Sequence, residues 1–212
     1  MPPLRDAPTT SRGRRTRAAL VAAAREVFEE LGFRDARISD IAERAGTSYG
    51  VFYHYFESKE AVLHELFTTV TGEMFAASRP QSGGPDEPLA KIEAANRQYL
   101  AASRRNTRLI AVIEEMAIRD AYFRTLKLQI RDMFLRRNEA GIRRLQERGL
   151  ADPQLDPAIT ASVLGGMVEH FTQMWFLHGV VFDEEAAVAT LTRLWAQAIG
   201  LRTGPTGTGP TG

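Results

Sequence analysis

The sequence predicts an all-α protein in which a short helix-turn-helix module precedes a larger helical domain. Apolar residues recur at helical spacing along almost all of the 212 residues, and no segment alternates apolar and polar residues as a strand does. Glycine, proline and capping residues interrupt this pattern. They divide it into nine expected helices, three short ones followed by six longer ones.

The first two expected helices each end at a glycine. An apolar stripe from Leu20 to Leu31 marks the first, which Gly32 ends. The second begins at Ile38 and ends at Gly46, because glycine can leave the right-handed backbone region without a Cβ clash. The tight turn expected at Gly46, with another short helix after it, is typical of a helix-turn-helix motif.

The third expected helix begins at Thr47 and turns Phe52, Tyr55 and Phe56 inward. At 100° per residue, its opposite side carries Tyr49, Gly50, Tyr53 and His54. Such a side suits the major groove of DNA, because hydroxyl and imidazole groups bond phosphates or base edges. The alternative is that these aromatic residues only build a small core, which we expect for Phe52 and Phe56.

The fourth expected helix begins near Ser58, whose hydroxyl can cap it. Lys59 lies at the same end, where helix amides and an ammonium can together hold a phosphate. The segment RPQSGGPDEP at residues 79–88 is the clearest break in the chain. The remaining helices are expected at 89–105, 107–119, 122–148, 157–178 and 183–200, with Asp156 and Asp183 as N-caps of the last two.

Composition narrows the class of protein. Cysteine is absent, which excludes disulfides, thiolate metal sites and cysteine nucleophiles. The net charge is only +1, but residues 1–17 hold five arginines against one aspartate, as in a disordered leader or a basic arm that wraps DNA. A basic pair before the apolar run 18–24 superficially resembles a signal peptide, but Arg25 and Glu26 interrupt that run. We therefore expect a cytoplasmic protein.

The segment from Thr16 to Phe67 resembles the DNA-binding domain of the tetracycline-repressor (TetR) family. The resemblance is carried by FEELGF at 28–33, DIAERAG at 40–46, FYHYF at 52–56 and SKE at 58–60. Together these motifs are far more specific than a generic helix-turn-helix match, and they lie in about a quarter of the chain. The remainder resembles the family only in its long helices.

The resemblance implies that the third helix reads the major groove, that Tyr53 and Lys59 contact phosphate, and that a dimer binds a palindrome. The resemblance also favours a basic arm that wraps DNA over a disordered leader for residues 1–17. Two departures stand out: Ala36-Arg37 replaces a hydroxyl cap of the second helix, and Tyr49 replaces a residue that is often basic. Arg37 can instead contact phosphate. The residues expected to bind DNA are Arg37, Thr47, Ser48, Tyr49, Gly50, Tyr53, His54 and Lys59.

The last two expected helices are rich in large apolar residues, and Gly165-Gly166 indicates the close approach of another helix. In the TetR family these helices form a four-helix bundle across a twofold axis, and a palindrome requires a twofold partner. The alternative is that both helices are buried within their own subunit. The expected interface residues are Val163, Met167, Phe171, Met174, Trp175, Leu191, Leu194 and Trp195.

The middle helices offer side chains for a small-molecule site, although an ordinary helical core contains similar residues. A hydrophobic or amphipathic effector is the expected ligand. The candidate ligand-binding residues are Phe67, Val70, Tyr99, Ile113, Met116, Phe123, Ile130, Phe134, Glu169, His170 and Gln173.

Two other classes of function compete with a regulator. No nucleophile–base pair, metal-ligand spacing or phosphate-binding glycine loop is recognisable, so we expect neither an enzyme nor a metal or cofactor. A helical protein-interaction module without a DNA role is the other alternative. We expect a ligand-responsive repressor with a disordered basic arm (1–15), a DNA-binding domain (16–58), a ligand-binding and dimerisation domain (59–201) and a disordered tail (202–212).

Overall fold

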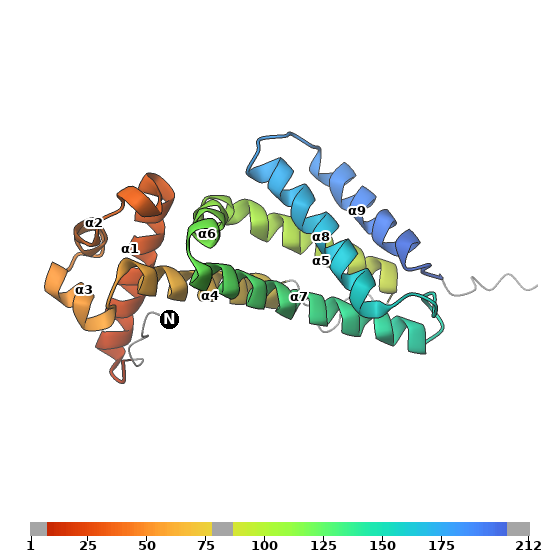
Figure 1. Cartoon of the computed structure of the whole chain (residues 1–212), viewed down its shortest axis with the longest axis horizontal. Helices are drawn as coiled ribbons and strands as arrows, with labels where there is room; N and C mark the ends of the chain where they lie inside the picture. Colours follow the sequence, from red (N-terminus) through yellow and green to blue (C-terminus); the bar gives the residue numbers. More distant parts are fainter. Residues whose placement is uncertain (1–7, 78–86, 203–212) are drawn as a thin grey trace, which may run out of the picture. The chain divides into compact units, whose positions relative to one another are not determined.

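The computed structural model describes residues 8–77 and 87–202, and within these ranges it contains nine helices and no strand (Figure 1). The predicted all-α fold is confirmed. The first residues of the expected basic arm, most of the predicted break after residue 78 and almost all of the expected tail lie outside the described residues.

The chain divides into two compact units. One contains the residues up to Met74 together with Asn106–Leu128, and the other contains Phe75–Arg105 together with the residues from Gln129 onward. Two of the three boundaries, after Met74 and after Leu128, fall within long helices, and the third, after Arg105, lies between two helices. The boundary expected at residue 58 separates a DNA-binding role from a ligand-binding role and not two compact units. It stays a prediction.

Helix α1 (Ser11–Asp35) begins inside the segment that composition assigned to a disordered arm. The hydroxyl of Thr10 caps it by accepting a hydrogen bond from the Gly13 amide over 3.1 Å. The arginines at 12, 14 and 15 therefore lie on the first turns of a helix. Gly32 interrupts α1 as predicted, with a φ of 75°, and one further turn follows up to Asp35.

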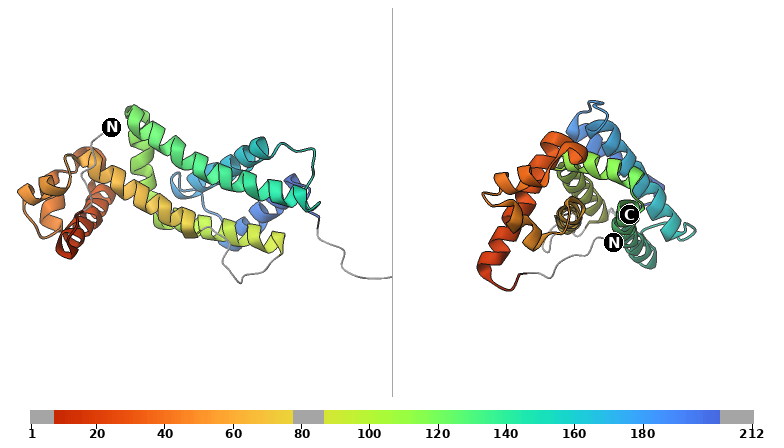
Figure 2. Two further views of the ribbon diagram at one scale, coloured as in Figure 1. Left: turned by 90° about the horizontal axis from the view of Figure 1, so that it is seen from below. Right: turned by 60° about the vertical axis from the view of Figure 1, so that its left-hand side comes forward.

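Helices α2 (Ile38–Arg44) and α3 (Tyr49–Tyr55) form the helix-turn-helix. Helix α2 packs against α1, and α3 packs against α2 (Figure 2). Gly46 lies between them with a φ of 65°, the left-handed conformation that the sequence predicts. Ile41 and Phe52 are fully buried, so each short helix is fixed by a large apolar side chain.

Helices α4 (Lys59–Ala77), α6 (Thr107–Arg119) and α7 (Ala121–Glu147) contribute to the first unit, and polar side chains of α1 reach two of them. The Arg17 guanidinium forms an ion pair with Glu65 of α4, with Nε 2.9 Å from Oε2. Arg25 donates to Oδ1 of Asn106, the residue before α6, over 2.9 Å. Helix α1 is thus tied to α4 and to the start of α6.

The imidazole of His64 in α4 is partly buried against Tyr122 of α7, whose hydroxyl donates to its Nδ1 when the histidine is neutral. Burial lowers the pKa of His64 from its ordinary value of 6.5, and the charge of Glu65 opposes this only in part. The unfolded chain therefore gains a proton at a higher pH than the folded protein. Stability should be retained above a pH of about 6.5 and decline as the pH falls below it.

We expect urea unfolding to show this decline between about pH 7.5 and about pH 5.5. The matched variant is His64→Asn, because its Oδ1 can accept the Tyr122 hydrogen bond without titrating over this range. It should lose less stability on acidification than the wild-type protein. If the two proteins lose the same amount, His64 does not contribute to the pH dependence.

The second unit is built around α5 (Pro88–Arg105), which packs against α8 (Pro157–Phe176) and α9 (Glu184–Ala198). The N-caps predicted for the last two helices are confirmed, because the carboxylates of Asp156 and Asp183 each accept a hydrogen bond from an amide in the first turn. The central apolar cluster contains Leu100, Val168, Trp175, Ala187, Val188 and Leu191.

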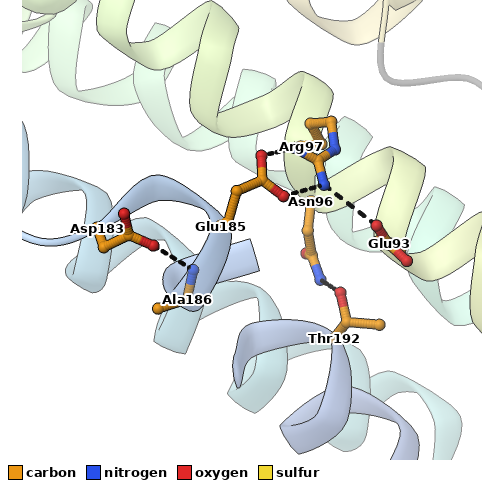
Figure 3. Close-up of polar contacts among 7 residues, drawn as sticks. All are labelled: Glu93, Asn96, Arg97, Asp183, Glu185, Ala186 and Thr192. Atoms are coloured by element: carbon orange, nitrogen blue, oxygen red, sulfur yellow. Dashed lines mark hydrogen bonds and ion pairs between the residues drawn. The ribbon is translucent and has the colours of Figure 1, made fainter. Parts of the chain in front are cut away.

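Two polar contacts add to the packing of α5 on α9 (Figure 3). The Arg97 guanidinium pairs with both carboxylate oxygens of Glu185. The Asn96 side-chain amide donates to the Thr192 hydroxyl over 3.3 Å, and both residues are buried. A buried amide and hydroxyl that satisfy each other cost little and fix the register of the two helices.

Within the subunit, side chains of another helix occupy the space beside Gly165 and Gly166. A Cβ atom at Gly165 would lie 3.1 Å from the Leu135 Cδ2 atom, and one at Gly166 would lie 3.3 Å from a guanidinium nitrogen of Arg131. Leu135 and Arg131 both belong to α7. The two glycines therefore leave room for these α7 side chains beside α8, and they give no argument for a dimer.

Candidate nucleic-acid interface

Helix α3 has a buried side and an exposed side. Phe52 and Phe56 are buried, and their ring centroids lie 5.7 Å apart. On the other side Tyr49 is 56% exposed, and His54 is exposed as well. Tyr53 lies at the border and is half-buried. The tyrosyl side therefore faces outward, as the helical spacing predicts.

Tyr49 and Tyr53 form a pair on this surface. Their hydroxyl oxygens lie 3.2 Å apart, within hydrogen-bonding distance, and their ring centroids lie 5.0 Å apart. The Tyr53 ring also meets the buried Phe52 ring edge-on at 5.6 Å, which limits its motion. The hydrogen bond with Tyr49 raises the pKa of Tyr53, so this phenol is a protonated donor at neutral pH. The pair presents two hydroxyl groups in a fixed orientation.

Helix α3 begins two residues later than predicted. Its N-cap is Ser48, whose hydroxyl accepts a hydrogen bond from the Val51 amide over 3.4 Å. Thr47 is half-buried in the turn before the helix, where its amide donates to the Ala42 carbonyl over 2.9 Å. Both hydroxyl residues can cap a helix, so local sequence did not decide between them.

Arg37 is the exposed N-cap residue of α2, at the position where a hydroxyl cap was expected to be missing. Asp40 compensates in part, because its carboxylate accepts a hydrogen bond from the Arg37 backbone amide over 2.9 Å. The Arg37 side chain takes no part in capping. A guanidinium therefore lies on the surface at the first turn of α2.

The basic start of α1 adjoins the end of α3. A Cβ atom at Gly13 would lie 3.6 Å from the Tyr55 hydroxyl oxygen. Arg12, Arg14 and Arg15 flank Gly13 and are exposed. The surface beside α3 therefore carries positive charge, which phosphate groups attract.

Comparison with known proteins places these features in one family. Residues 20–66 match the model of the bacterial regulatory proteins of the tetR family. The chain is 29% identical over 178 residues to the uncharacterized HTH-type transcriptional regulator YdgC of Bacillus subtilis (strain 168), covering 80% of this chain and 86% of YdgC. The N-terminal domain is of the tetR-family type.

Two further comparisons also find regulators. The HTH-type transcriptional repressor KstR2 of Rhodococcus jostii (strain RHA1) is 27% identical over 148 residues, or 67% of this chain and 72% of KstR2. The solved structure of the fatty acid degradation regulator FadR from Bacillus halodurans has the same fold, with a TM-score of 0.74, 21% identity, and coverage of 88% of this chain and 97% of FadR. The protein is a transcriptional regulator with a DNA-binding N-terminal domain, and these relatives are regulators rather than enzymes.

The Lys59 side chain forms its hydrogen bonds within the protein. Its Nζ atom donates to the carbonyl oxygens of Phe33 over 2.7 Å and Ala36 over 2.8 Å, and it lies 3.4 Å from the Arg34 carbonyl oxygen. The ammonium is also 4.6 Å from the Phe33 ring centroid. The phosphate contact that the family resemblance implies for this side chain is not the arrangement seen here.

The candidate ligand-binding residues fall in both compact units. Those in the first unit are all buried. Of those in the second, Ile130 and Gln173 are half-buried and His170 is exposed. The buried residues of the first unit are Phe67, Val70, Ile113, Met116 and Phe123.

The remaining three candidates in the second unit lie near one another. Tyr99 of α5 and Phe134 of α7 have ring centroids 6.2 Å apart, and Glu169 of α8 pairs with Arg131 of α7 at 3.4 Å. Burial raises the pKa of Tyr99 to about 12, and the charge of Glu169 adds to this increase.

Sequence reasoning missed three polar residues around Tyr99. Its hydroxyl is hydrogen-bonded with the side chains of Ser103 and Thr172, which are buried, while Arg131 is a nearby positive charge. Ser103 lies on the same helix as Tyr99, one turn away, and this spacing was a signal that could have been read. Thr172 and Arg131 belong to α8 and α7, and no pattern in the sequence connects them to Tyr99.

The expected dimer residues divide by exposure. Trp175 and Leu191 are 8% and 4% exposed in the core of their own subunit, so for these two residues the structure favours the alternative of burial within the subunit. Val163 and Leu194 are 63% and 43% exposed, and Ile159 on α8, which was not among the expected interface residues, is 65% exposed. Met167, Phe171, Met174 and Trp195 are half-buried.

Within residues 8–77 and 87–202, no three histidine or acidic side chains are grouped so that they could hold a metal ion. In the same ranges no helix is long and apolar enough to cross a membrane.

Proposed function

We propose that this TetR regulator is a repressor that binds a palindromic operator as a homodimer and is released by a small hydrophobic or amphipathic effector. The observation that carries the DNA-binding part is the exposed tyrosyl side of α3, held outward by the fully buried Phe52. A repressor role is supported by the similarity to KstR2, which is described as a repressor.

The proposed DNA contacts are of two kinds. Tyr49 and His54 reach base edges from the exposed side of α3, while Tyr53 and Arg37 contact phosphates at its border and at the first turn of α2. Gly50, which is exposed and has no side chain, allows the backbone to come close to the groove. Ser48 and Thr47 lie at the start of the helix, within reach of the sugar–phosphate backbone.

The proposed dimer uses the exposed apolar face of α8 and α9, which we define as Ile159, Val163 and Leu194. Large apolar side chains that are 43–65% exposed lose contact with water when a second copy covers them. A twofold dimer presents two copies of α3, and an inverted repeat presents two matching half-sites.

The proposed effector site lies in the second unit around Tyr99. The Tyr99 and Phe134 rings provide apolar surface, and the Glu169–Arg131 pair provides charge at one end. An amphipathic molecule matches this combination of surfaces. The reciprocal effect of linkage is that operator DNA must weaken effector binding.

One experiment tests the central claim. Purified protein selects from a random-sequence duplex pool, and the recovered duplexes are sequenced and footprinted. We expect an inverted repeat with half-site centres one or two helical turns apart, where one turn is about 34–36 Å. Recovered sequences without twofold symmetry would rule out the palindrome, and the absence of any enrichment would favour the protein-interaction module.

A further inference from the structure

The Lys59 ammonium is fully engaged within the protein. An ammonium group has three donor hydrogens, and three carbonyl oxygens lie within 3.4 Å of Nζ. The two shortest of these contacts are to Phe33 and Ala36, at 2.7 and 2.8 Å, and both are partly buried. No donor remains for a phosphate while these bonds persist.

The carbonyls that Lys59 binds need a partner. They belong to the last turn of α1 after Gly32 and to its C-cap residue Ala36, where a helix has no further amides to offer. A positive charge is favourable at such a helix end. Ala36 directly precedes Arg37, the N-cap of α2. The Lys59 ammonium is therefore bonded to the residue directly before the N-cap of α2.

Movement of Lys59 toward DNA would leave these carbonyls without their donor. Phe33 and Ala36 are 8% and 2% exposed, so little water can reach this junction to replace the ammonium. The contact with the Phe33 ring would also be lost. The arrangement is that of a clamp between α4 and the α1–α2 junction.

We propose that Lys59 is a positioning residue, whose ammonium holds the α1–α2 junction where the Arg37 guanidinium can reach a phosphate and which does not itself bind DNA. The role of Arg37 rests on the proposed function, whereas the clamp does not. The inference reverses the assignment of Lys59 that the family resemblance implies.

The first test uses the free wild-type protein. The chain has three lysines, Lys59, Lys91 and Lys127, so reductive methylation can be followed at each by mass spectrometry. The rate at each lysine is compared with that of the same lysine in the urea-unfolded chain. We expect Lys59 to be methylated at least about tenfold more slowly in the folded protein, because its amine must first leave the carbonyls. A Lys59 that reacts equally fast in both states overturns the clamp, whatever the protein does with DNA.

The second test is a double-mutant cycle on a duplex selected by the wild-type protein. Lys59→Met keeps the chain length of lysine without its charge, and Arg37→Ala removes the phosphate contact. Each lost phosphate contact lowers the slope of log affinity against log salt by about 1 per protomer. A positioning role predicts that Lys59→Met weakens binding in the wild-type background but causes no further loss of slope when Arg37 is already alanine.

A direct phosphate contact predicts the opposite result, in which Lys59→Met lowers the slope equally in both backgrounds, and that result overturns the proposal. If Lys59→Met does not fold, the methylation rates still decide the case for the clamp. A wild-type protein that selects no duplex would refute the proposed function but would leave the methylation result standing, so the two failures are distinguishable.

Discussion

Tyr53→Ala should abolish specific operator binding while the protein remains folded and dimeric. Tyr53 is half-buried at the edge of α3, with its hydroxyl 3.2 Å from that of Tyr49 and its ring against Phe52. Alanine removes the proposed phosphate contact and also releases Tyr49 from its hydrogen bond. A twofold dimer loses these interactions at both half-sites, so the loss of binding free energy is doubled.

A conservative variant distinguishes the contribution of the Tyr53 hydroxyl to DNA binding from that of its ring. Tyr53→Phe should weaken operator binding by about 10- to 100-fold, measured by fluorescence anisotropy at fixed salt concentration. The matched control is Tyr55→Phe, the same change two residues along, whose hydroxyl lies beside Gly13 of α1. It should change affinity no more than about twofold. If Tyr53→Ala dissociates or unfolds the dimer, Tyr53 is a packing residue and the proposed contact is wrong.

The features that sequence predicted well depend on neighbours along the chain. The φ angles of Gly32 and Gly46 are set by the need to end a right-handed helix, and the caps at Asp156 and Asp183 use amides three residues away. The outward side of α3 follows from helical period alone. Such features are local, so a single sequence contains all the information they require.

The features that sequence did not predict depend on tertiary contacts. The Lys59 ammonium donates to the carbonyl of Phe33, 26 residues earlier in the chain, and no local sequence pattern near either residue predicts this contact. An apolar period likewise indicates that Trp175 and Val163 belong on a helix side that favours burial, but not which surface covers them. The structure separates the two, because Trp175 is 8% exposed and Val163 is 63% exposed.

Because Val163 is exposed in the subunit whereas Trp175 is buried, a substitution at Val163 can test the dimer interface without disturbing the fold. Val163→Arg places a charge on the exposed apolar face, at a site where the monomer leaves the side chain in water. Arginine also favours a helix slightly more than valine, so the isolated subunit should keep its stability. In the proposed dimer, by contrast, both copies of the charge would be buried without a partner, which costs about 3–5 kcal/mol or more.

We therefore expect the dissociation constant of the Val163→Arg dimer to rise by at least about a hundredfold, measured by sedimentation velocity over a range of concentrations. Leu194→Arg should act in the same direction. Operator affinity should fall in parallel, because a monomer engages only one half-site.

The matched control is Ile118→Arg, at a residue of α6 that is 77% exposed and outside the proposed face. It makes the same chemical change on an exposed helix and should leave the dimer intact. Equal dissociation by all three variants would indicate a general effect of added positive charge. A Val163→Arg protein that remains as tightly dimeric as the wild type would show that α8 does not form the interface, and the two copies of α3 would then have to be brought together by another surface.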